Sequence, residues 1–276
     1  MLLQIKKLGD YYFTTDNFVP SDGQVLFAKI CFSIYLISLI FTTIYCLFQL
    51  QLWIKYRKYR KEHPTDPPLP VIKDADLPVV TVQLPMFNEM YVAEKLIDVI
   101  TKFDYPKDKL EIHVLDDSTD DTQTIAANKV QEYKNKGFNI EYIHRTNRQG
   151  YKAGALKEGM EKATGEFMAI FDADFEPHPD FLRKTIPYFL TDPTIGVVQT
   201  RWEHSNEDYS MITKLQALQL NVHFTVEQMG RSAGNFLLQF NGTAGVWRRK
   251  TIDDAGGWEA DTLTEDLDLS YRAQMK

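Results

Sequence analysis

The hydrophobic and polar residues divide the chain into one long apolar segment and a larger region of alternating runs. From Ile30 to Ile54 no charged residue occurs, and about 20 apolar residues suffice for a helix to cross a bilayer. We therefore predict a transmembrane helix at 25–54. A buried core helix and a cleaved signal peptide are the alternatives, but the run is long for a signal core and no small-residue cleavage site follows it.

The charges on either side of this segment predict its orientation. The basic run KYRKYRK follows it at 55–61, whereas the residues before it mix aspartates with lysines. Short basic flanks stay on the cytoplasmic side of a membrane. We expect an integral membrane protein in contact with the lipid bilayer, with 1–24 outside the cytoplasm and everything after residue 55 inside it.

A basic and proline-rich linker is predicted at 55–78, because its prolines cannot continue a helix. Beyond it, at 79–276, short apolar runs alternate with longer amphipathic ones, which is typical of an α/β fold with a mainly parallel sheet. Apolar residues at helical spacing in 208–230 predict a packed helix. Strands are predicted at 79–84, 110–115, 139–144, 166–172 and 195–201.

Composition and charge exclude several classes of protein. The formal net charge is −7, which argues against nucleic-acid binding, because a phosphate backbone is bound by an excess of Lys and Arg. The two cysteines, Cys31 and Cys46, both lie in the apolar segment, so neither a disulfide framework nor a cysteine zinc site is predicted. The six histidines show no metal-ligand spacing.

Polar and acidic residues follow three of the predicted strands. In an open α/β sheet, ligands bind at the carboxyl ends of the strands, so these residues should converge on one cleft. Helix capping is the alternative for Asn88, Asp117, Ser118 and Thr119. The residues at the three strand ends are Asn88 and Glu89, Asp116 and Asp117, and Asp172 and Asp174.

The closely spaced Asp172 and Asp174 in FDADF suggest a divalent cation. Their carboxylates are hard oxygen ligands that suit Mg²⁺ or Mn²⁺, and such ions complete their coordination with water and substrate phosphates. Arg148, Gly150 and Lys152 lie at the predicted start of a helix and could contact those phosphates. We predict Lys152 as the main phosphate contact, with an ordinary solvated lysine as the alternative.

A D-x-D sequence alone is not specific to one activity. Phosphatases of the haloacid dehalogenase type also place it at the end of a buried strand, with the first Asp as nucleophile. Their motif normally continues to Thr or Val two residues after the second Asp, whereas here Phe175 and Glu176 follow. The chain has no G-x-x-x-x-G-K-[ST] loop, which excludes the ordinary P-loop nucleotidases.

A series of longer motifs occurs in the region 78–276. In chain order they are LPMFNE, VLDDSTDDT, NRQGYKAGALKEGM, FDADF, HFTVEQ, FNGTAGVWR and TEDLDLSYRAQ. This series resembles the membrane-bound glycosyltransferases of family 2, and is most similar to the cellulose synthase-like A and C groups. The resemblance implies a GT-A (Rossmann-like) fold, a nucleotide-sugar donor, a divalent metal and inversion at the anomeric carbon.

The resemblance also implies roles for single residues. Asp116 and Asp117 match the motif that contacts the nucleoside, Asp172 matches the position near the diphosphate, and Asp174 matches the metal ligand. Asp266, in TED, matches the general base. An acceptor hydroxyl must lose its proton as it attacks the anomeric carbon, and a carboxylate within hydrogen-bond reach can take it.

Asp266 also has a structural interpretation, because TEDLDL is a good helix start with Thr264 as cap. The two interpretations are compatible, since a rigid first turn would hold a base in position. We expect FNGTAGVWR to form a glycine-rich turn beside the acceptor. Trp247 and Glu265 are predicted on the acceptor side, Trp247 by stacking on a sugar, with core packing as the alternative for Trp247.

The family members differ from this chain in one respect. Processive members continue beyond TED with a Q-x-x-R-W motif and further transmembrane helices, neither of which appears before Lys276. We therefore expect a fragment of a longer protein or a natural truncation. The predicted function is transfer of glucose or mannose from UDP-glucose or GDP-mannose to a glycan by a cytoplasmic domain. A D-x-D phosphatase and an inactive nucleotide-sugar-binding protein are the alternatives.

Overall fold

The computed structural model describes residues 21–65 and 68–276. The predicted segment 1–24 therefore lies almost entirely outside the described residues. The chain divides into two compact units between Leu52 and Trp53. The domain limits given above stay predictions.

The apolar segment forms part of one long helix, α2 (Asp22–Glu62). Among the described residues it is the one helix long and apolar enough to cross a membrane, with a mean hydropathy of 2.2 in its most apolar window. The helix continues through the basic run because Lys, Arg and Glu favour helix and no proline occurs between Asp22 and Pro64. Hydroxyl groups inside the apolar part donate to carbonyls one turn earlier, which satisfies them without water. They belong to Ser33, Ser38, Thr42 and Thr43.

The rest of the chain is built on a six-stranded sheet with the order β3-β2-β1-β4-β6-β5. β1, β2, β3 and β4 are parallel, whereas β6 runs antiparallel to both β4 and β5. The fold is thus the mainly parallel α/β sheet that the sequence predicts. The strands are β1 (Val80–Met86), β2 (Leu110–Asp116), β3 (Asn139–His144), β4 (Phe167–Ile170), β5 (Val197–Gln199) and β6 (Gly245–Arg248).

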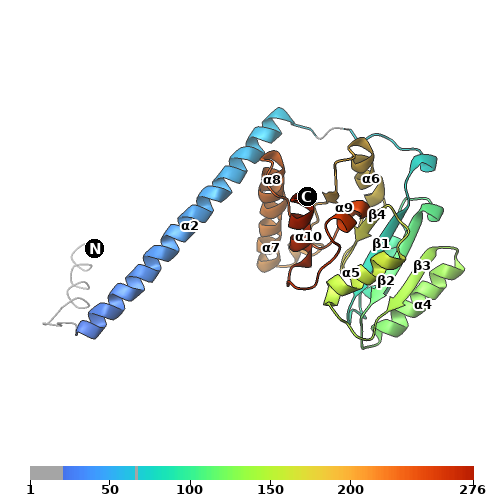
Figure 1. Ribbon diagram of the computed structural model, residues 1–276, viewed down its shortest axis with the longest axis horizontal. Coiled ribbons are helices and arrows are strands. Elements are labelled where there is room, and N and C mark those ends of the chain that lie inside the picture. Colours follow the sequence, from blue (N-terminus) through green and yellow to red (C-terminus); the bar gives the residue numbers. More distant parts are fainter. Residues whose placement is uncertain (1–20, 66–67) are drawn as a thin grey trace. The chain divides into compact units, whose positions relative to one another are not determined.

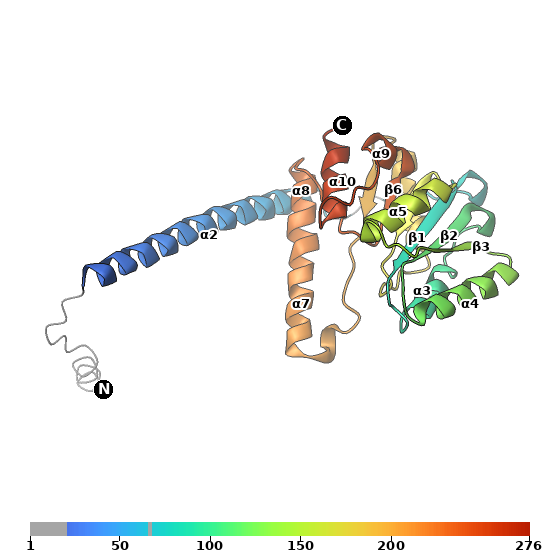
Figure 2. The same cartoon turned by 60° about the horizontal axis from the view of Figure 1, so that its bottom comes forward.

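Helices cover both faces of this sheet (Figures 1 and 2). One hydrophobic cluster joins the sheet to α3 (Ala93–Ile100), α4 (Thr122–Asn135) and α6 (Phe181–Thr191). A second cluster on the opposite face joins it to α5 (Tyr151–Lys162), α9 (Arg249–Asp254) and α10 (Glu265–Gln274). Every residue of β4 is fully buried, as expected for a central strand covered on both faces. Short 3₁₀ turns lie at η1 (Asp74–Asp76), η2 (Lys107–Lys109) and η3 (Glu207–Tyr209).

Two sequence predictions of local structure were incomplete. β6 was missed, because the strand is only four residues long, ends in Arg248 and follows a glycine-rich loop. The helical segment predicted at 208–230 is interrupted by a π-helical turn, η4 (His223–Gln228), between α7 (Met211–Val222) and α8 (Met229–Ala233).

The prediction that this helix is packed was wrong for α7. Its side chains at helical spacing are 45 to 79% exposed, so the described residues leave this apolar stripe uncovered. Hydrophobic periodicity predicts a helix face that can be buried, but it does not show what buries that face. The stripe consists of Met211, Leu215, Leu218 and Val222.

A buried polar network ties the central strands to the loop before β4. Glu111 on β2 accepts hydrogen bonds from the hydroxyl of Thr81 on β1 and from the backbone N–H of Thr164, at 2.8 Å. The N–H of Gly165 donates to the Thr81 hydroxyl at 2.9 Å. Burial alone would raise the pKa of Glu111, but the hydrogen bonds from His113, Thr81 and Thr164 outweigh it and lower that pKa to about 2.

This network should make stability depend on pH. The folded-state pKa of Glu111 lies below its ordinary value, so the ionised group stabilises the fold above about pH 4.5 and loses this effect as the pH falls towards 2. The shift corresponds to about 3 kcal/mol. We expect the free energy of unfolding of the parent protein to exceed that of the Glu111→Gln variant at pH 7. This difference should become smaller at pH 3. Urea titrations of both full-length proteins in detergent measure the two free energies. A difference between them that does not change with pH would contradict the prediction.

Candidate active site

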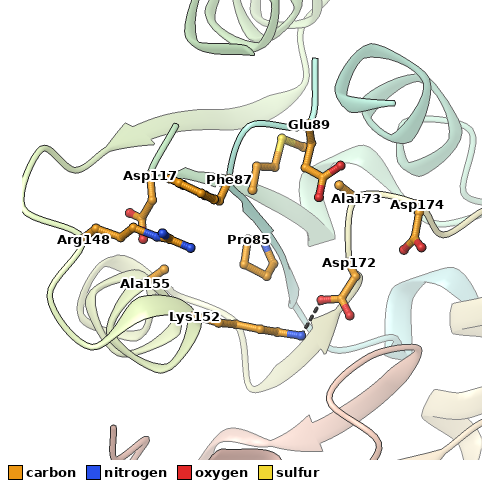
Figure 3. Close-up of a pocket in the computed structure, with 11 residues that line it drawn as sticks. Pro85, Phe87, Glu89, Asp117, Arg148, Lys152, Ala155, Asp172, Ala173 and Asp174 are labelled. Atoms are coloured by element: carbon orange, nitrogen blue, oxygen red, sulfur yellow. Dashed lines mark hydrogen bonds and ion pairs between the residues drawn. The ribbon is translucent and has the colours of Figure 1, made fainter. Parts of the chain in front are cut away.

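A cleft of about 330 Å³ opens at the carboxyl ends of β1, β2 and β4. Figure 3 shows Asp117 and Arg148 at one end, Glu89, Asp172 and Asp174 at the other, and Lys152 between them. Pro85, Met86, Phe87, Ala155 and Ala173 complete the lining. Six of the residues predicted from the sequence thus meet in one cavity: Glu89, Asp117, Arg148, Lys152, Asp172 and Asp174.

Asn88 and Asp116 do not line this cleft but connect the loops that form it. The N–H of Asn88 donates to Ser118 Oγ at 2.8 Å, and Asn88 Oδ1 accepts from the N–H of Thr119 at 2.9 Å. Asp116 is buried and accepts from the N–H of Ser118 and from the hydroxyl of Tyr142. The helix-capping interpretation was also wrong here, because the N-cap residues of α3 and α4 are Val92 and Asp121.

Asp117 is held in place by an arginine that the sequence analysis missed. Arg145 binds both carboxylate oxygens of Asp117, and it also donates to the carbonyls of Gln149 and Tyr151. The two side chains are 5 and 7% exposed, so the pair is almost fully desolvated. Gly154 permits this arrangement, since a Cβ there would lie 1.9 Å from the carbonyl oxygen of Gln149. The turn before α5 is therefore rigidly attached to the carboxylate of Asp117.

Arg148 stacks on an aromatic side chain at the same end of the cleft. Its guanidinium carbon lies 3.2 Å from the ring centroid of Phe87 and 5.1 Å from that of Tyr151. The backbone of Arg148 and Tyr151 has positive φ angles of 42° and 49°, which bulky residues rarely adopt. Such strain persists where the surroundings enforce it, and it is common at binding sites.

Three carboxylates gather at the opposite end of the cleft. Burial, and then the negative charges of Asp174 and Asp172, raise the pKa of Glu89. None of the described residues forms a hydrogen bond or ion pair with Asp174. This uncompensated negative charge and the all-oxygen donor set fit a hard divalent cation such as Mg²⁺ or Mn²⁺. Asp172 and Asp174 would hold it.

Lys152 links the acidic end to the loop before β6. Its amino group forms an ion pair with Asp172 (Figure 3) and donates to the carbonyl of Gly242 at 3.0 Å. The N–H of Asp172 donates in turn to Thr243 Oγ1 at 2.9 Å. The alternative of an ordinary solvated lysine does not describe this side chain, because its amino group is held inside the cleft by two partners.

Asp266 and Lys152 approach Gly242 from the same side. A Cβ built on Gly242 would be 3.0 Å from Asp266 Oδ2 and 3.5 Å from Lys152 Nζ. Thr264 occupies the N-cap position of α10, but its side chain makes no capping hydrogen bond. Asp266 Oδ1 instead accepts from the N–H of Leu267 at 2.8 Å, which orients the carboxylate. Burial raises the pKa of the neighbouring Glu265, against the opposing charge of Lys152.

The predicted stacking of Trp247 on an acceptor sugar was wrong. Trp247 is fully buried and packs edge to face against Phe240 and Trp258, with ring centroids 5.4 and 6.4 Å away. It lies on the unpredicted strand β6, where it faces Met168 of β4 in the register. Its ring therefore has no face available to a ligand, and the core-packing alternative applies.

A second acidic cluster lies outside the cleft. Within the described part of the chain, Glu259, Asp261 and Asp268 are the group whose three ligand atoms lie within 4.8 Å of one another. Arg272 forms ion pairs with Asp268 at 2.7 Å and with Glu259 at 3.9 Å. This arginine supplies much of the positive charge that a metal ion would otherwise provide, so the cleft is the better candidate.

Comparisons with known proteins agree with this geometry. The family described as Glycosyl transferase family 2 matches residues 81–254. Glucomannan 4-beta-mannosyltransferase 2 of Arabidopsis thaliana is 47% identical over 206 residues, which are 73% of this chain and 39% of that protein. Glucomannan 4-beta-mannosyltransferase 1 of Oryza sativa subsp. japonica is 45% identical over 224 residues, 80% of this chain and 43% of that protein. The chain thus spans about two fifths of the length of these relatives.

A solved structure extends the similarity to the fold. The mannosyltransferase PcManGT from Pyrobaculum calidifontis, in complex with GDP-Man and Mn²⁺, superposes with a TM-score of 0.59 at 27% sequence identity. The match covers 82% of this chain and 59% of the archaeal chain. The GT-A type of fold expected from the sequence motifs is therefore confirmed.

The two acidic clusters predict different sites of Mn²⁺ binding. We expect Asp174→Asn to weaken Mn²⁺ binding by the full chain about tenfold or more, because a direct carboxylate ligand is lost. Asp261→Asn is the matched control and should leave the affinity unchanged. Titration of Mn²⁺ followed by electron paramagnetic resonance measures both. The reverse result would place the metal at the cluster around Arg272.

Proposed function

This chain belongs to glycosyl transferase family 2, and we propose that it transfers a hexose from a nucleotide sugar to a hydroxyl group of a glycan, with inversion. The observation that carries the proposal is the meeting of Lys152, Asp172 and Asp266 around Gly242. The ammonium group of Lys152, which could bind phosphate, and the carboxylate of Asp266, which could accept a proton, thus lie close together. Family membership removes the D-x-D phosphatase from consideration.

The acceptor hydroxyl must lose a proton while it attacks the anomeric carbon. Asp266 is proposed as the base, because Oδ1 is held by the N–H of Leu267 while Oδ2 faces the Gly242 side of the site. A positioned carboxylate of this kind contributes about 10²- to 10⁴-fold to a rate. Attack from the side opposite the leaving group inverts the configuration at the anomeric carbon.

The leaving nucleoside diphosphate gains negative charge as the glycosidic bond to it breaks. The ammonium group of Lys152, fixed by Asp172 and the carbonyl of Gly242, can stabilise that charge without rearrangement. A Mg²⁺ or Mn²⁺ ion held by Asp172 and Asp174 would supply further positive charge at the diphosphate. With these groups in place no general acid is needed.

The nucleoside is proposed to bind at the other end of the cleft. Asp117, locked by Arg145, offers oriented acceptors, and Arg148 on Phe87 offers a flat cationic surface with several donors. We propose GDP-mannose as the donor, supported by the mannosyltransferase names of the relatives and by the GDP-Man bound to the archaeal neighbour. UDP-glucose is the second candidate.

The remaining proposals concern the surroundings of this domain. α2 is proposed to anchor the protein in a bilayer, with the domain that follows it on the cytoplasmic side, supported by the hydropathy of the helix and the basic residues at its end. The acceptor is proposed to be a growing glycan. Glu265 is proposed to face it, because it lies beside Asp266 and within the electrostatic field of Lys152.

Transfer is tested directly with labelled donors. The full chain in nanodiscs is incubated with a glycan acceptor, Mn²⁺ and either GDP-[¹⁴C]mannose or UDP-[¹⁴C]glucose. Incorporation into material digested by β-mannanase is the expected result, and incorporation only from UDP-glucose would change the donor. Donor binding without incorporation would instead indicate an inactive nucleotide-sugar-binding protein.

Removal of the proposed base should separate binding from transfer. We expect Asp266→Asn to lose at least about a hundredfold in kcat, because proton removal is lost, while the Kd for donor measured by calorimetry stays within about twofold. Asp261→Asn, an exposed acidic residue before α10, is the control. Near-normal transfer by Asp266→Asn would contradict the role of the base.

Two glycines with similar backbone conformations provide a second test. Gly242 and Gly137 have φ values of +75° and +79°, but a Cβ meets Asp266 Oδ2 only at Gly242, whereas nothing lies within 4 Å at Gly137. Either Gly→Ala change should cost about 1 kcal/mol of stability. We expect only Gly242→Ala to abolish most of the transfer, because its methyl group displaces the base. Equal activity of both variants would exclude a functional contact there.

A further inference from the structure

The loop 240–244 is the point at which the separate parts of the site are joined. The carbonyl of Gly242 accepts from Lys152, and the hydroxyl of Thr243 accepts from the N–H of Asp172. The Cα of Gly242 also borders the carboxylate of Asp266. The relative positions of the phosphate-binding lysine, the D-x-D turn and the proposed base therefore depend on where this loop lies.

Asn241 attaches this loop to the rest of the protein. Its N–H donates to Gln199 Oε1 on β5 at 2.8 Å. Its side-chain oxygen accepts from Gln228 Nε2 at 3.3 Å and faces His223 Nε2, also at 3.3 Å. Gln228 Nε2 further donates to the carbonyl of Gln239 at 2.8 Å. Two side chains of the π-helical turn η4 thus converge on one oxygen atom of the loop.

The π-helical geometry explains how both side chains reach Asn241. His223 and Gln228 are five residues apart, and in an α-helix such residues point about 140° away from each other. A π-helical turn closes its hydrogen bonds between residues i and i+5, so these two positions lie one above the other. A regular α-helix would present either His223 or Gln228 to the loop, but not both. Such turns are often found at functional sites.

The π-helical turn is itself held firmly. The second ring nitrogen of His223 lies 2.8 Å from a carboxylate oxygen of Glu227. Phe224 is buried and packs edge to face on Trp202, with ring centroids 5.5 Å apart, and Trp202 packs in the same way on Phe175. Phe175 directly follows the Asp172–Asp174 turn. The turn is thus a fixed support from which the loop can be positioned.

We propose that His223 and Gln228 are positioning residues for sugar transfer. Through Asn241 they fix Gly242 and Thr243, and so set Lys152 and Asp172 against Asp266. The inference rests on the proposed function, because the geometry it concerns is that of the transfer site. Neither His223 nor Gln228 lines the cleft, so their effect reaches the reacting groups only through the loop.

Substitutions that remove each side chain in contact with Asn241 test the proposal in the full chain. We expect His223→Phe and Gln228→Met to lower kcat about tenfold, because small misplacements of reacting groups are costly. The KM for the donor should stay within about twofold of the parent value, because the proposed nucleoside contacts of Asp117 and Arg148 lie at the far end of the cleft. Gln219→Met, the same change at an exposed position of α7, is the control. His223→Gln keeps a side chain that can hydrogen-bond to Asn241 and should recover most of the rate.

A double-mutant cycle shows whether the two residues act through Asn241. Asn241→Leu removes the shared oxygen, so adding His223→Phe to it should cause little further loss of kcat. If the loss of kcat in the double variant equals the product of the two single losses, His223 acts by another route and the inference is overturned. So would unchanged kcat in both single variants while the parent protein is active.

The exposure of Lys152 supplies a readout that needs no activity. The full chain is treated with acetic anhydride, and acetylation of Lys152 is followed by mass spectrometry. We expect several-fold faster labelling in His223→Phe and Gln228→Met than in the parent or Gln219→Met, because the carbonyl of Gly242 no longer stays in place. Equal labelling rates would overturn the inference. Absence of transfer by the parent protein would instead contradict the proposed function, and labelling would still decide the role of the π-helical turn.

Discussion

The pairing of β4 with two neighbours of opposite direction brings the acidic end of the cleft and the loop 240–244 together. β4 is completely buried, so its backbone groups must find partners inside the protein. The parallel strand β1 supplies them on one side and the antiparallel strand β6 on the other. The first neighbour places Asp172 at the ligand-binding edge of the sheet. The second brings the loop 240–244 back to that same edge, where Gly242 meets Lys152 of α5 and Asp266 of α10.

The charges of the site follow from this crowding. Carboxylates from three strand ends repel one another in a partly buried cleft. Burial first, and then the negative charges of Asp174 and Asp172, raise the pKa of Glu89. Positive side chains neutralise the negative charges of these carboxylates unequally along the cleft. Arg145 neutralises Asp117 and Lys152 pairs with Asp172, whereas Asp174 has no partner among the described residues. We therefore propose that a divalent cation and a diphosphate bind beside the unpaired Asp174, and a nucleoside beside Asp117.

Several residues that the motifs predicted as ligand contacts have a structural role instead. Asn88 and Asp116 stand in acidic or polar motifs, yet their side chains connect neighbouring loops. Trp247 was expected at a sugar and belongs to the core, because it lies on a strand too short to be recognised. Arg145 was not predicted, because a single arginine outside the motifs forms no recognisable sequence pattern. A search for a cation able to neutralise Asp117 could have suggested it, but its distance in the sequence leaves many candidates.

The amino-acid sequence by itself determined the long apolar helix, the mainly parallel α/β fold and the strand ends at which Glu89, Asp117, Asp172 and Asp174 converge. These features depend on local periodicity and on the rule that parallel strands share one ligand-binding edge. Only the tertiary structure decided which partners these side chains take. The contacts of Gly242 with Lys152 and Asp266, and of Asn241 with His223 and Gln228, join segments far apart in the chain. No local pattern encodes such contacts, because they arise from the packing of whole elements against one another.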